Sequence, residues 1–547
     1  MNKILKTVFF LTIILFAFSQ SAFAQGVTTA AMNGFVSDND GNPLPGANVI
    51  ALHEPSGTRY GAATRANGVF NLPNVKIGGP YKITASFIGF NQYEEGGIFL
   101  NIGQTLKLDI QLSSETVELG ELVVTGEIDN ILNSSRTGAE TSISPDEVVA
   151  LPTIKRSTRD LTRLDPRSDG NFSFGGKNWL YNNISVDGSY FNNPFGLDDP
   201  APGGQTNAEP LPYDAVEQVQ VSIAPFDVRE GGFTGAGINT VTKSGTNEYK
   251  GSVYTFYRND AMQGDEVGDI KLNLPELTYN QYGFTVSGPI IKNKLFFFIN
   301  GEIERRKDPG TNFSADEGGG VTATESRVTV STMNQIRQRM IDVYGYDPGP
   351  FQGFDHETAN EKILAKLDWN INDRNNLVFR FNYLDARQEK PPHPFAISFN
   401  NTGRGPNQNS LPFQNSGYEI NNQLASFALE LNSRYEDFAN KFFVSYNRFR
   451  DFRNPFSDPY PTIEIAEGGI TYTTVGHEPF SIHNILDQDV LQITNNFSYY
   501  MGNHVLTVGA TFEYFDFFNS FNLFRFGFMG FNTWPGQTAF ESVQAFL

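Results

Sequence analysis

The sequence predicts a mainly β protein whose second half forms part of a large antiparallel transmembrane β-barrel. From about Tyr249 onward, apolar and polar residues alternate, as in NNLVFRFNYLD, where Leu377 and Phe379 alternate with Arg380 and Asn382. Strands of about ten residues with one apolar and one polar face are typical of barrels with a wet interior. A soluble β-sandwich produces the same alternation, so a single strand does not distinguish the two folds.

The connections between the expected strands favour the barrel. PIIKN, INDRN, YEDFAN and MGN are short, and the connections that alternate with them are far longer. The connection over about 307–359 contains a predicted helix, STMNQIRQRMIDVYG. Outer-membrane barrels have short turns on one side and long loops on the other, and about nine or ten such strands precede Leu547.

Composition excludes several classes of function. The 547 residues leave room for several domains. With 40 Lys and Arg against 60 Asp and Glu, the formal net charge is −20, which repels nucleic acid, so we expect no nucleic-acid partner. The absence of cysteine rules out disulfides, cysteine-bound zinc and iron–sulfur clusters.

Residues 1–24 are predicted to be a secretory signal peptide. Lys3 and Lys6 precede the apolar stretch VFFLTIILFAF, and Ala22-Phe23-Ala24 forms a cleavage site of small residues. The alternative is a membrane-anchoring helix, but the apolar stretch is short for crossing a bilayer. The sequence therefore predicts export.

Residues 26–113 are predicted to form a small β-sandwich. Short alternating runs are separated by hairpin-type turns at Asn39-Asp40-Gly41 and Asn67-Gly68. The spacing Asp38-x-Asp40 resembles the start of a calcium loop. However, Pro43 occupies the position where glycine is needed and Val49 the position of the final Glu, so we interpret the stretch as a turn.

Residues 114–127 form a linker, and residues 128–245 an α+β segment. The linker contains the isolated β-prone run ELVVTGE. In the α+β segment, SISPDEVVAL and KRSTRDLTRL begin like capped helices, and YNNISVDG and AVEQVQVSIAP are predicted strands.

A glycine run, GGFTGAG at 231–237, ends the α+β segment. It is not a phosphate-binding loop, because Lys243 follows Thr242 rather than a glycine. We expect the glycines to allow close backbone packing. The chain then passes near residue 245 into the barrel segment, residues 246–547.

These segments together resemble a TonB-dependent outer-membrane receptor of the Oar-like, Bacteroidetes type with an N-terminal carboxypeptidase regulatory-like domain. The motifs that carry the resemblance are PLPGANV, NGVFNL and ASFIGF in the first domain, then LPTIKRSTRDLTRLDP, SVDG, APFDVREGGFTGAGINTVTKSGTN and FTVSGPIIKNKLFFFINGE. The resemblance implies that 128–245 is a plug domain inside a barrel of about 22 strands. Since this chain has under half of those strands, we expect it to be an N-terminal fragment of a longer product.

The resemblance implies uptake of a glycan, peptide or chelate through the outer membrane, driven by TonB and its inner-membrane energising complex. Leu122, Val123, Val124 and Thr125 are the candidate TonB box, because an extended β-branched run can pair with a sheet edge. The alternative is that this run is an inert linker or the last strand of the sandwich. The barrel would contact outer-membrane lipids, with the N-terminal domain in the periplasm and the long loops outside the cell.

A barrel that assists secretion, surface display or adhesion is the alternative function. A neighbouring gene for a surface lipoprotein would make such a lipoprotein a further partner and would indicate capture of glycans or peptides.

Six residues of the plug segment are candidate substrate-binding residues: Asn178, Trp179, Tyr181, Asn182, Tyr190 and Phe191. Aromatic faces beside amide groups suit glycans or peptides. The alternative is that they wedge the plug inside a wet lumen.

The sequence predicts no enzyme, no catalytic residue, no metal and no cofactor. It contains no nucleophile elbow and no HExxH motif, and no histidine has Glu three residues later. We expect the six histidines to be solvated loop residues.

Overall fold

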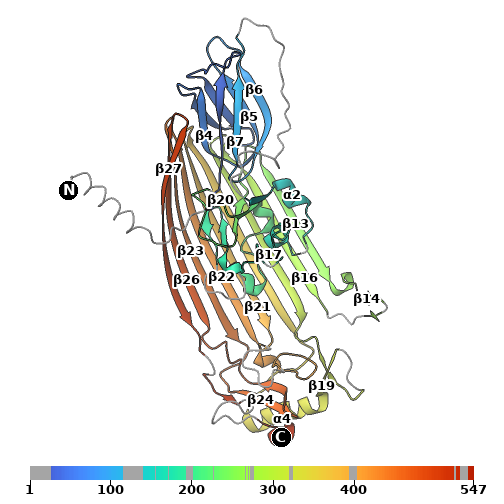
Figure 1. The fold of residues 1–547 in the computed structure, drawn as a ribbon. Helices are drawn as coiled ribbons and strands as arrows, with labels where there is room; N and C mark the ends of the chain where they lie inside the picture. Colours follow the sequence, from blue (N-terminus) through green and yellow to red (C-terminus); the bar gives the residue numbers. More distant parts are fainter. Residues whose placement is uncertain are drawn as a thin grey trace, which may run out of the picture.

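The computed structural model describes residues 26–114, 139–192 and 201–547, apart from 154, 171, 226, 265, 269, 272–275, 320–323, 394–402, 523–524 and 530–539. The predicted signal peptide and the candidate TonB box at Leu122–Thr125 lie outside the described residues. Figure 1 shows a β-sandwich at one end of a long curved sheet, a small unit against one face of that sheet, and a compact group of loops at its other end.

The long sheet, which we call the wall, contains nine strands in the described part of the chain. Its order is β13-β16-β17-β20-β21-β22-β23-β26-β27, all neighbours being antiparallel. The strands are β13 Lys250–Asn259, β16 Thr278–Ile291, β17 Leu295–Pro309, β20 Asp355–Asn372, β21 Asn375–Lys390, β22 Tyr418–Arg434, β23 Phe438–Pro455, β26 Ile485–Met501 and β27 His504–Ser520. The predicted barrel strands and their short turns are confirmed.

Each wall strand has two different faces, as the alternation predicts. Ile363, Leu367 and Trp369 of β20 are 40–46% exposed on the outer face. Their neighbours Lys362 and Lys366 are buried on the inner face. Apolar side chains on the outer face suit contact with lipid. The backbone polar groups in the sheet interior also tolerate lipid, because they are paired within the sheet.

The sandwich consists of β1 to β7. The described strands form two sheets, β4-β1-β7 and β3-β2-β5-β6, with β1 and β7 parallel to each other. The bounds are β1 Ala30–Ser37, β2 Asn48–His53, β3 Thr58–Ala63, β4 Val69–Val75, β5 Gly78–Ser86, β6 Tyr93–Leu100 and β7 Thr105–Gln111. Phe70, Tyr81 and Leu100 are among the fully buried side chains between the sheets. The Asp38 carboxylate accepts hydrogen bonds from the backbone N–H groups of Asp40 and Asn42, so the stretch is a turn.

The described residues between 139 and 245, which we call the plug, lie against the inner face of the wall (Figure 1). The described plug strands form one sheet in the order β10-β9-β12-β11-β8. They are β8 Ala139–Ile143, β9 Asn183–Val186, β10 Ser189–Tyr190, β11 Val216–Ile223 and β12 Gly237–Thr242. Leu384, Phe449 and Val490 of the wall belong to the same buried core as Val219 and Ile238 of the plug.

The two helices expected in the plug are present. α2 (Pro145–Ala150) begins with a capping box, in which the Ser144 hydroxyl accepts from the Glu147 backbone and the Glu147 carboxylate accepts from the Ser144 backbone. α3 (Thr158–Thr162) is capped by the Ser157 hydroxyl, which accepts from the backbone of Arg159. Among the described residues, none of the helices is both long and apolar enough to cross a bilayer.

Chain segments that follow β17, β21, β23 and β27 come together in a unit of their own at the far end of the wall, which we call the loop cap (Figure 1). The connection between β13 and β16, which contains the short strands β14 Glu266–Val267 and β15 Ile270–Lys271, lies apart from it. The elements of the loop cap are β18 Ser314–Asp316, β19 Glu325–Thr329, α4 Val330–Tyr344, β24 Thr462–Glu467, β25 Ile470–Val475, β28 Phe528–Met529 and α5 Val543–Phe546. Met333, Ile336 and Met340 of α4 share a buried core with Ile465 and Phe546. The helix predicted in this connection is therefore confirmed, and its buried face serves a common core formed by several loops.

Glycines allow the plug to turn into the wall. A Cβ atom at Gly235 would lie 2.4 Å from Asn182 Oδ1. One at Gly245 would lie 2.4 Å from the backbone oxygen of Phe297 and 3.0 Å from that of Gly288. Real Cβ atoms do not approach backbone oxygens so closely, so glycine is required where the chain passes from plug to wall.

We expect Gly245→Ala to destabilise the junction of plug and wall by roughly 1–3 kcal/mol, because the obstacle is backbone and cannot rotate away. Semi-native electrophoresis of the detergent-solubilised chain measures this as a lower temperature at which the folded band disappears. Gly264→Ala is the matched control, since nothing lies within 4 Å of a Cβ atom there. Equal temperatures for the two variants would contradict the steric argument.

Candidate functional site

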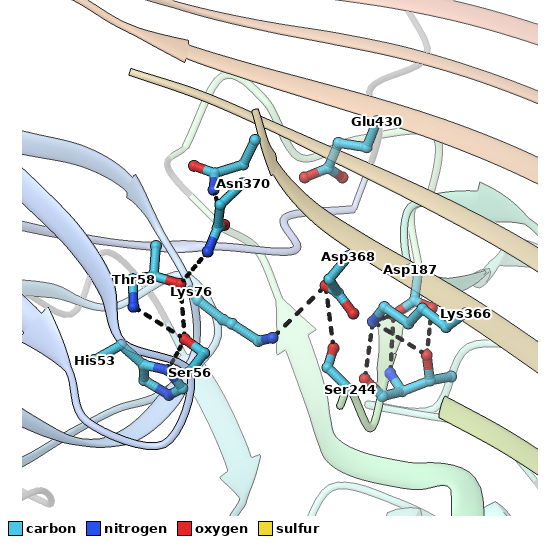
Figure 2. Close-up of polar contacts among 12 residues, drawn as sticks. His53, Ser56, Thr58, Lys76, Asp187, Ser244, Lys366, Asp368, Asn370 and Glu430 are labelled. Atoms are coloured by element: carbon cyan, nitrogen blue, oxygen red, sulfur yellow. Dashed lines mark hydrogen bonds and ion pairs between the residues drawn. The ribbon is translucent and has the colours of Figure 1, made fainter. Parts of the chain in front are cut away.

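A cavity of about 530 Å³ lies where the sandwich, the plug and the wall meet. Its lining is rich in charged and polar side chains that come from all three units, and Figure 2 shows many of them. The cavity is at the short-turn end of the wall, since Asn370 near the end of β20 and Asn376 near the start of β21 both line it.

The sandwich contributes a chain of hydrogen bonds that ends on the wall (Figure 2). His53 Nδ1 lies 2.6 Å from Ser56 Oγ, which lies 2.7 Å from Thr58 Oγ1. Thr58 Oγ1 accepts a hydrogen bond of 2.8 Å from Nδ2 of Asn370. Lys76, which lies between β4 and β5 of the sandwich, reaches the same wall strand, β20.

Asp368 connects the sandwich to the end of the plug. Its Oδ1 lies 3.6 Å from Lys76 Nζ and accepts a hydrogen bond of 3.4 Å from the Ser244 hydroxyl. Its Oδ2 has no hydrogen-bond partner among the described residues. Asp368 is thus a partly satisfied, buried carboxylate that ties the sandwich and the end of the plug to β20.

Asp187 of the plug is a buried carboxylate that lies between two cations of the wall. Its oxygens lie 3.8 Å from Lys366 Nζ and 3.5 Å from Arg380 Nη1. They also accept hydrogen bonds of 2.8 and 2.6 Å from the backbone and hydroxyl of Thr242. The wall cations bind plug backbone as well, because Lys366 donates to the Thr242 carbonyl and Arg380 to that of Val186. Asp187 therefore neutralises charges that would otherwise be buried without a partner.

Glu430 of β22 pairs with residues from two other segments. Its Oε2 lies 3.2 Å from Lys441 Nζ of β23 and accepts a hydrogen bond of 2.9 Å from the hydroxyl of Thr28, which precedes the sandwich. Its Oε1 accepts from Asn432. The site is a network of paired charges around a cavity that also has apolar lining residues, among them Phe296, Trp369 and Phe443.

The six predicted substrate-binding residues are divided between the surface and the interior. Phe191 is fully buried and packs edge-to-face on Phe449 of the wall. Asn182 is also buried, donating to the carbonyl of Phe172 and accepting from the backbone of Ala236. Both side chains have structural partners within the protein, in agreement with the alternative that they wedge the plug.

The other four predicted residues retain exposed surface. Tyr181 is 57% exposed, and Asn178, also exposed, caps the short helix Trp179–Tyr181. Trp179 and Tyr190 are partly buried against the plug core, where Tyr190 lies edge-to-face against Phe515 of β27. Asn178, Trp179 and Tyr181 are adjacent, so a surface for substrate stays a prediction that rests on these three.

The histidine prediction is wrong for three of the six residues. His53, His356 and His477 are buried rather than solvated. For His53 the reason is the sandwich core, where its ring lies 4.9 Å from that of Tyr81. Within the described residues, no group of three or more His, Asp or Glu side chains is arranged to hold a metal ion.

The charged residues around the cavity were not singled out from the sequence. One signal was available, since Lys366 and Asp368 lie on the polar face of an alternating strand. That signal places them in the lumen, but it does not identify the plug and sandwich groups across from them. Asp187 belongs to the SVDG motif and could have been proposed on that basis.

Comparisons with known families match both ends of the chain. A family model described as "Outer membrane beta barrel domain" matches residues 241–547, and one described as "Carboxypeptidase regulatory-like domain" matches residues 31–113. The first match covers more than half of the 547 residues.

Curated relatives include TonB-dependent proteins of other bacteria. The chain is 24% identical over 406 residues to the TonB-dependent transporter Oar of Myxococcus xanthus, a match that covers 70% of this chain and 36% of Oar. It is 33% identical over 130 residues to the TonB-dependent receptor SusC of Bacteroides thetaiotaomicron, covering 24% of this chain and 11% of SusC. The chain thus spans little more than a third of the length of Oar and less of SusC.

Among solved structures, the outer membrane transporter YddB from Escherichia coli matches with 12% identity and a TM-score of 0.46, covering 69% of this chain and 48% of that chain. The resemblance to TonB-dependent outer-membrane receptors that the motifs predicted is confirmed by the family and relative matches.

We expect Asp187→Ala to loosen the plug, since it leaves Lys366 and Arg380 without their buried counter-charge, a loss of about 3–5 kcal/mol. Limited proteolysis of the folded chain in detergent measures this as faster cleavage within 139–245. Asp187→Asn is the control that keeps the shape and the acceptor oxygen but loses the charge. If both variants resist cleavage like the parent chain, the charge does not hold the plug.

We expect the sandwich to lose stability in acid through His53. Burial, and secondarily the charge of Lys76, lowers the pKa of His53 to about 3. The unfolded chain takes up this proton near its ordinary pKa of about 6.5, whereas the folded chain does not. The free energy of unfolding is therefore highest above about pH 6.5. Below that pH it falls by about 1.4 kcal/mol per pH unit until the folded pKa is reached. Calorimetry of the full chain should show the sandwich transition falling between pH 6.5 and 4.

His53→Phe, which keeps a ring against Tyr81, should flatten this pH dependence. An unchanged slope in the variant would assign the pH dependence to other groups.

Proposed function

The chain belongs to the outer membrane beta barrel domain family and is an outer-membrane protein, and from this premise we propose that it takes up a polar solute with energy delivered through TonB. The proposal rests mainly on the buried ion pairs that the plug residue Asp187 forms with the wall residues Lys366 and Arg380. A lumen filled by a plug that is tied through buried charges opens only at a considerable energetic cost. An external energy source, as in TonB-dependent transporters, meets that requirement.

The orientation we propose follows from the connections. The short turns and the sandwich lie at one end of the wall and the loop cap at the other (Figure 1). In outer-membrane barrels the short turns face the periplasm and the long loops face outward. The sandwich is accordingly in the periplasm and the loop cap outside the cell.

TonB, with its inner-membrane energising complex, is the proposed partner, and Leu122, Val123, Val124 and Thr125 are its proposed binding segment. An extended β-branched run can add as a strand to the edge of a partner's sheet. In chain order this segment stands between the sandwich, described to residue 114, and the plug, described from residue 139, so a pull on it acts on both.

The proposed substrate is a glycan, a peptide or a chelate. Asn178, Trp179 and Tyr181 offer an amide and two aromatic faces on the surface of the plug. Such a combination recognises sugars or peptide groups by stacking and hydrogen bonding. A surface lipoprotein that presents the substrate is a further partner within this proposal.

We expect deletion of residues 121–126 to abolish uptake while export and membrane insertion continue, because the deletion removes the proposed TonB contact and no described residue. Three radiolabelled probes measure uptake in cells that express the full chain: a maltooligosaccharide, a mixture of tripeptides and a ferric catecholate. Heat-modifiable migration of the barrel serves as the control for insertion.

Equal uptake by the deleted and intact chains would contradict the assignment of the TonB box. Loss of surface material, with no change in uptake of any probe, would instead favour the alternative role in secretion or surface display.

A further inference from the structure

The sandwich is docked on the short-turn rim of the wall through side-chain contacts that are mainly polar. Asn67 Nδ2 donates a hydrogen bond of 2.6 Å to Asn503 Oδ1 in the turn between β26 and β27. The backbone N–H of Asn247 donates to the carbonyl of Pro55, at 2.8 Å. The Thr58–Asn370 and Lys76–Asp368 contacts described above add two more points of attachment along the same rim.

Arg434, the last residue of β22, makes the most extensive of these contacts. Its guanidinium lies 4.6 Å from the ring centre of Tyr60 and donates a hydrogen bond of 3.1 Å to the carbonyl of Asn74. It also donates to the side chain of Asn376 in the wall. One wall residue therefore contacts two strands of the sandwich, β3 through a cation–π contact and β4 through a charge-assisted hydrogen bond.

This interface is suited to open and close. A hydrogen bond between neutral groups contributes about 0.5–1.5 kcal/mol net and one that involves a charged group about 1.5–3 kcal/mol, because water replaces it on separation. Polar interfaces between domains of one chain permit relative motion unless they are large and apolar. Among the described residues, Val241 of the plug is the one buried apolar residue from outside the sandwich that joins the sandwich core.

The docked sandwich covers the route that a solute would take on leaving the plug. The cavity is bordered by the sandwich on one side and by plug and wall on the others. Figure 1 shows the sandwich standing over the short-turn end of the wall and the plug. A solute that passed between plug and wall would therefore meet the sandwich before it left the protein.

The sandwich is also linked to the plug by side chains. Gln218 of β11 accepts a hydrogen bond of 3.0 Å from the backbone of Ile102 and donates one of 3.1 Å to Asn101. Since the proposed TonB segment follows the sandwich and precedes the plug in the chain, one pull loads both the rim contacts and these plug contacts.

We propose that the N-terminal sandwich is a reversible exit gate, pinned to the wall by Arg434, which must leave the rim before a transported solute passes from the cavity. The proposal rests on the proposed function, since a gate over this cavity matters only if solute arrives there. It assigns a mechanical role to the sandwich and a positioning role to Arg434.

The first experiment measures undocking without any transport. Ser56 is buried at the docked face, and the natural chain has no cysteine, so Ser56→Cys provides a single reporter thiol. In the purified full chain, Arg434→Ala should raise the rate at which a maleimide labels this thiol by about tenfold, as loss of one cation–π contact and one charged hydrogen bond predicts.

Arg374→Ala is the matched control, because Arg374 lies at the same rim and stacks on Tyr435 of the wall. Lys76→Ala tests the interface from the sandwich side should Arg434→Ala fail to give the folded band in electrophoresis. Labelling rates equal to those of the parent for the folded variants would overturn the proposal.

The second experiment locks the gate. Asn67→Cys with Asn503→Cys, joined by a short, reducible bifunctional thiol reagent, tethers the sandwich to the rim. Asn91→Cys with Ser113→Cys is the matched pair, since these two side chains hydrogen-bond to each other at 3.3 Å within the sandwich. Bridging the first pair should stop uptake of the probe that the intact chain transports, reductant should restore it, and bridging the second pair should leave uptake unchanged.

Undiminished uptake through the tethered chain would overturn the gate. If the intact chain takes up none of the three probes, that result counts against the proposed function, and the labelling experiment alone then decides whether the sandwich undocks at Arg434.

Discussion

The inner face of the wall carries charges that cannot be buried without partners, and the arrangement of the other units depends on this constraint. Lys366, Arg380 and Glu430 point inward because their neighbours along each strand are apolar and face outward. Burying an unpaired charge is far more costly than burying an ion pair. The plug supplies Asp187 and backbone carbonyls, and the segment before the sandwich supplies Thr28.

The pairing of buried charges also matters for the solute path that the proposed function requires. The plug is held by buried ion pairs and by an apolar core that it shares with the wall, and a cavity lies where plug, wall and sandwich meet. The ion pairs and hydrogen bonds can be remade after separation, since water solvates each polar group that is released. Under the proposed function, an energised pull has to break these contacts, whereas continuous hydrogen-bond ladders hold neighbouring wall strands together.

The loop cap is held together by apolar packing. Connections after β17, β21, β23 and β27 each contribute residues to one apolar core, which includes Ile336, Phe413, Ile465 and Phe546. The described residues of these loops pack on one another through this shared core. The two ends of the wall therefore carry different structures, the loop cap at one end and the sandwich at the other.

Local patterns in the sequence determined the strands, the short turns and the helix caps. The period of two places Lys366 inward and Ile363 outward, and the Ser144–Glu147 spacing specifies a capping box. These features depend on neighbours in the chain or on the hydrogen-bond ladder, and a sequence displays both.

Only the tertiary structure decided which groups meet. Asp187 contacts cations nearly two hundred residues away, His53 is buried by the sandwich core, and Phe191 packs on Phe449 of the wall. Alternation reveals which face a side chain occupies but not what stands opposite that face. That information arises when the sheet curves around the plug and brings distant segments together, and the cavity and its paired charges exist only in that arrangement.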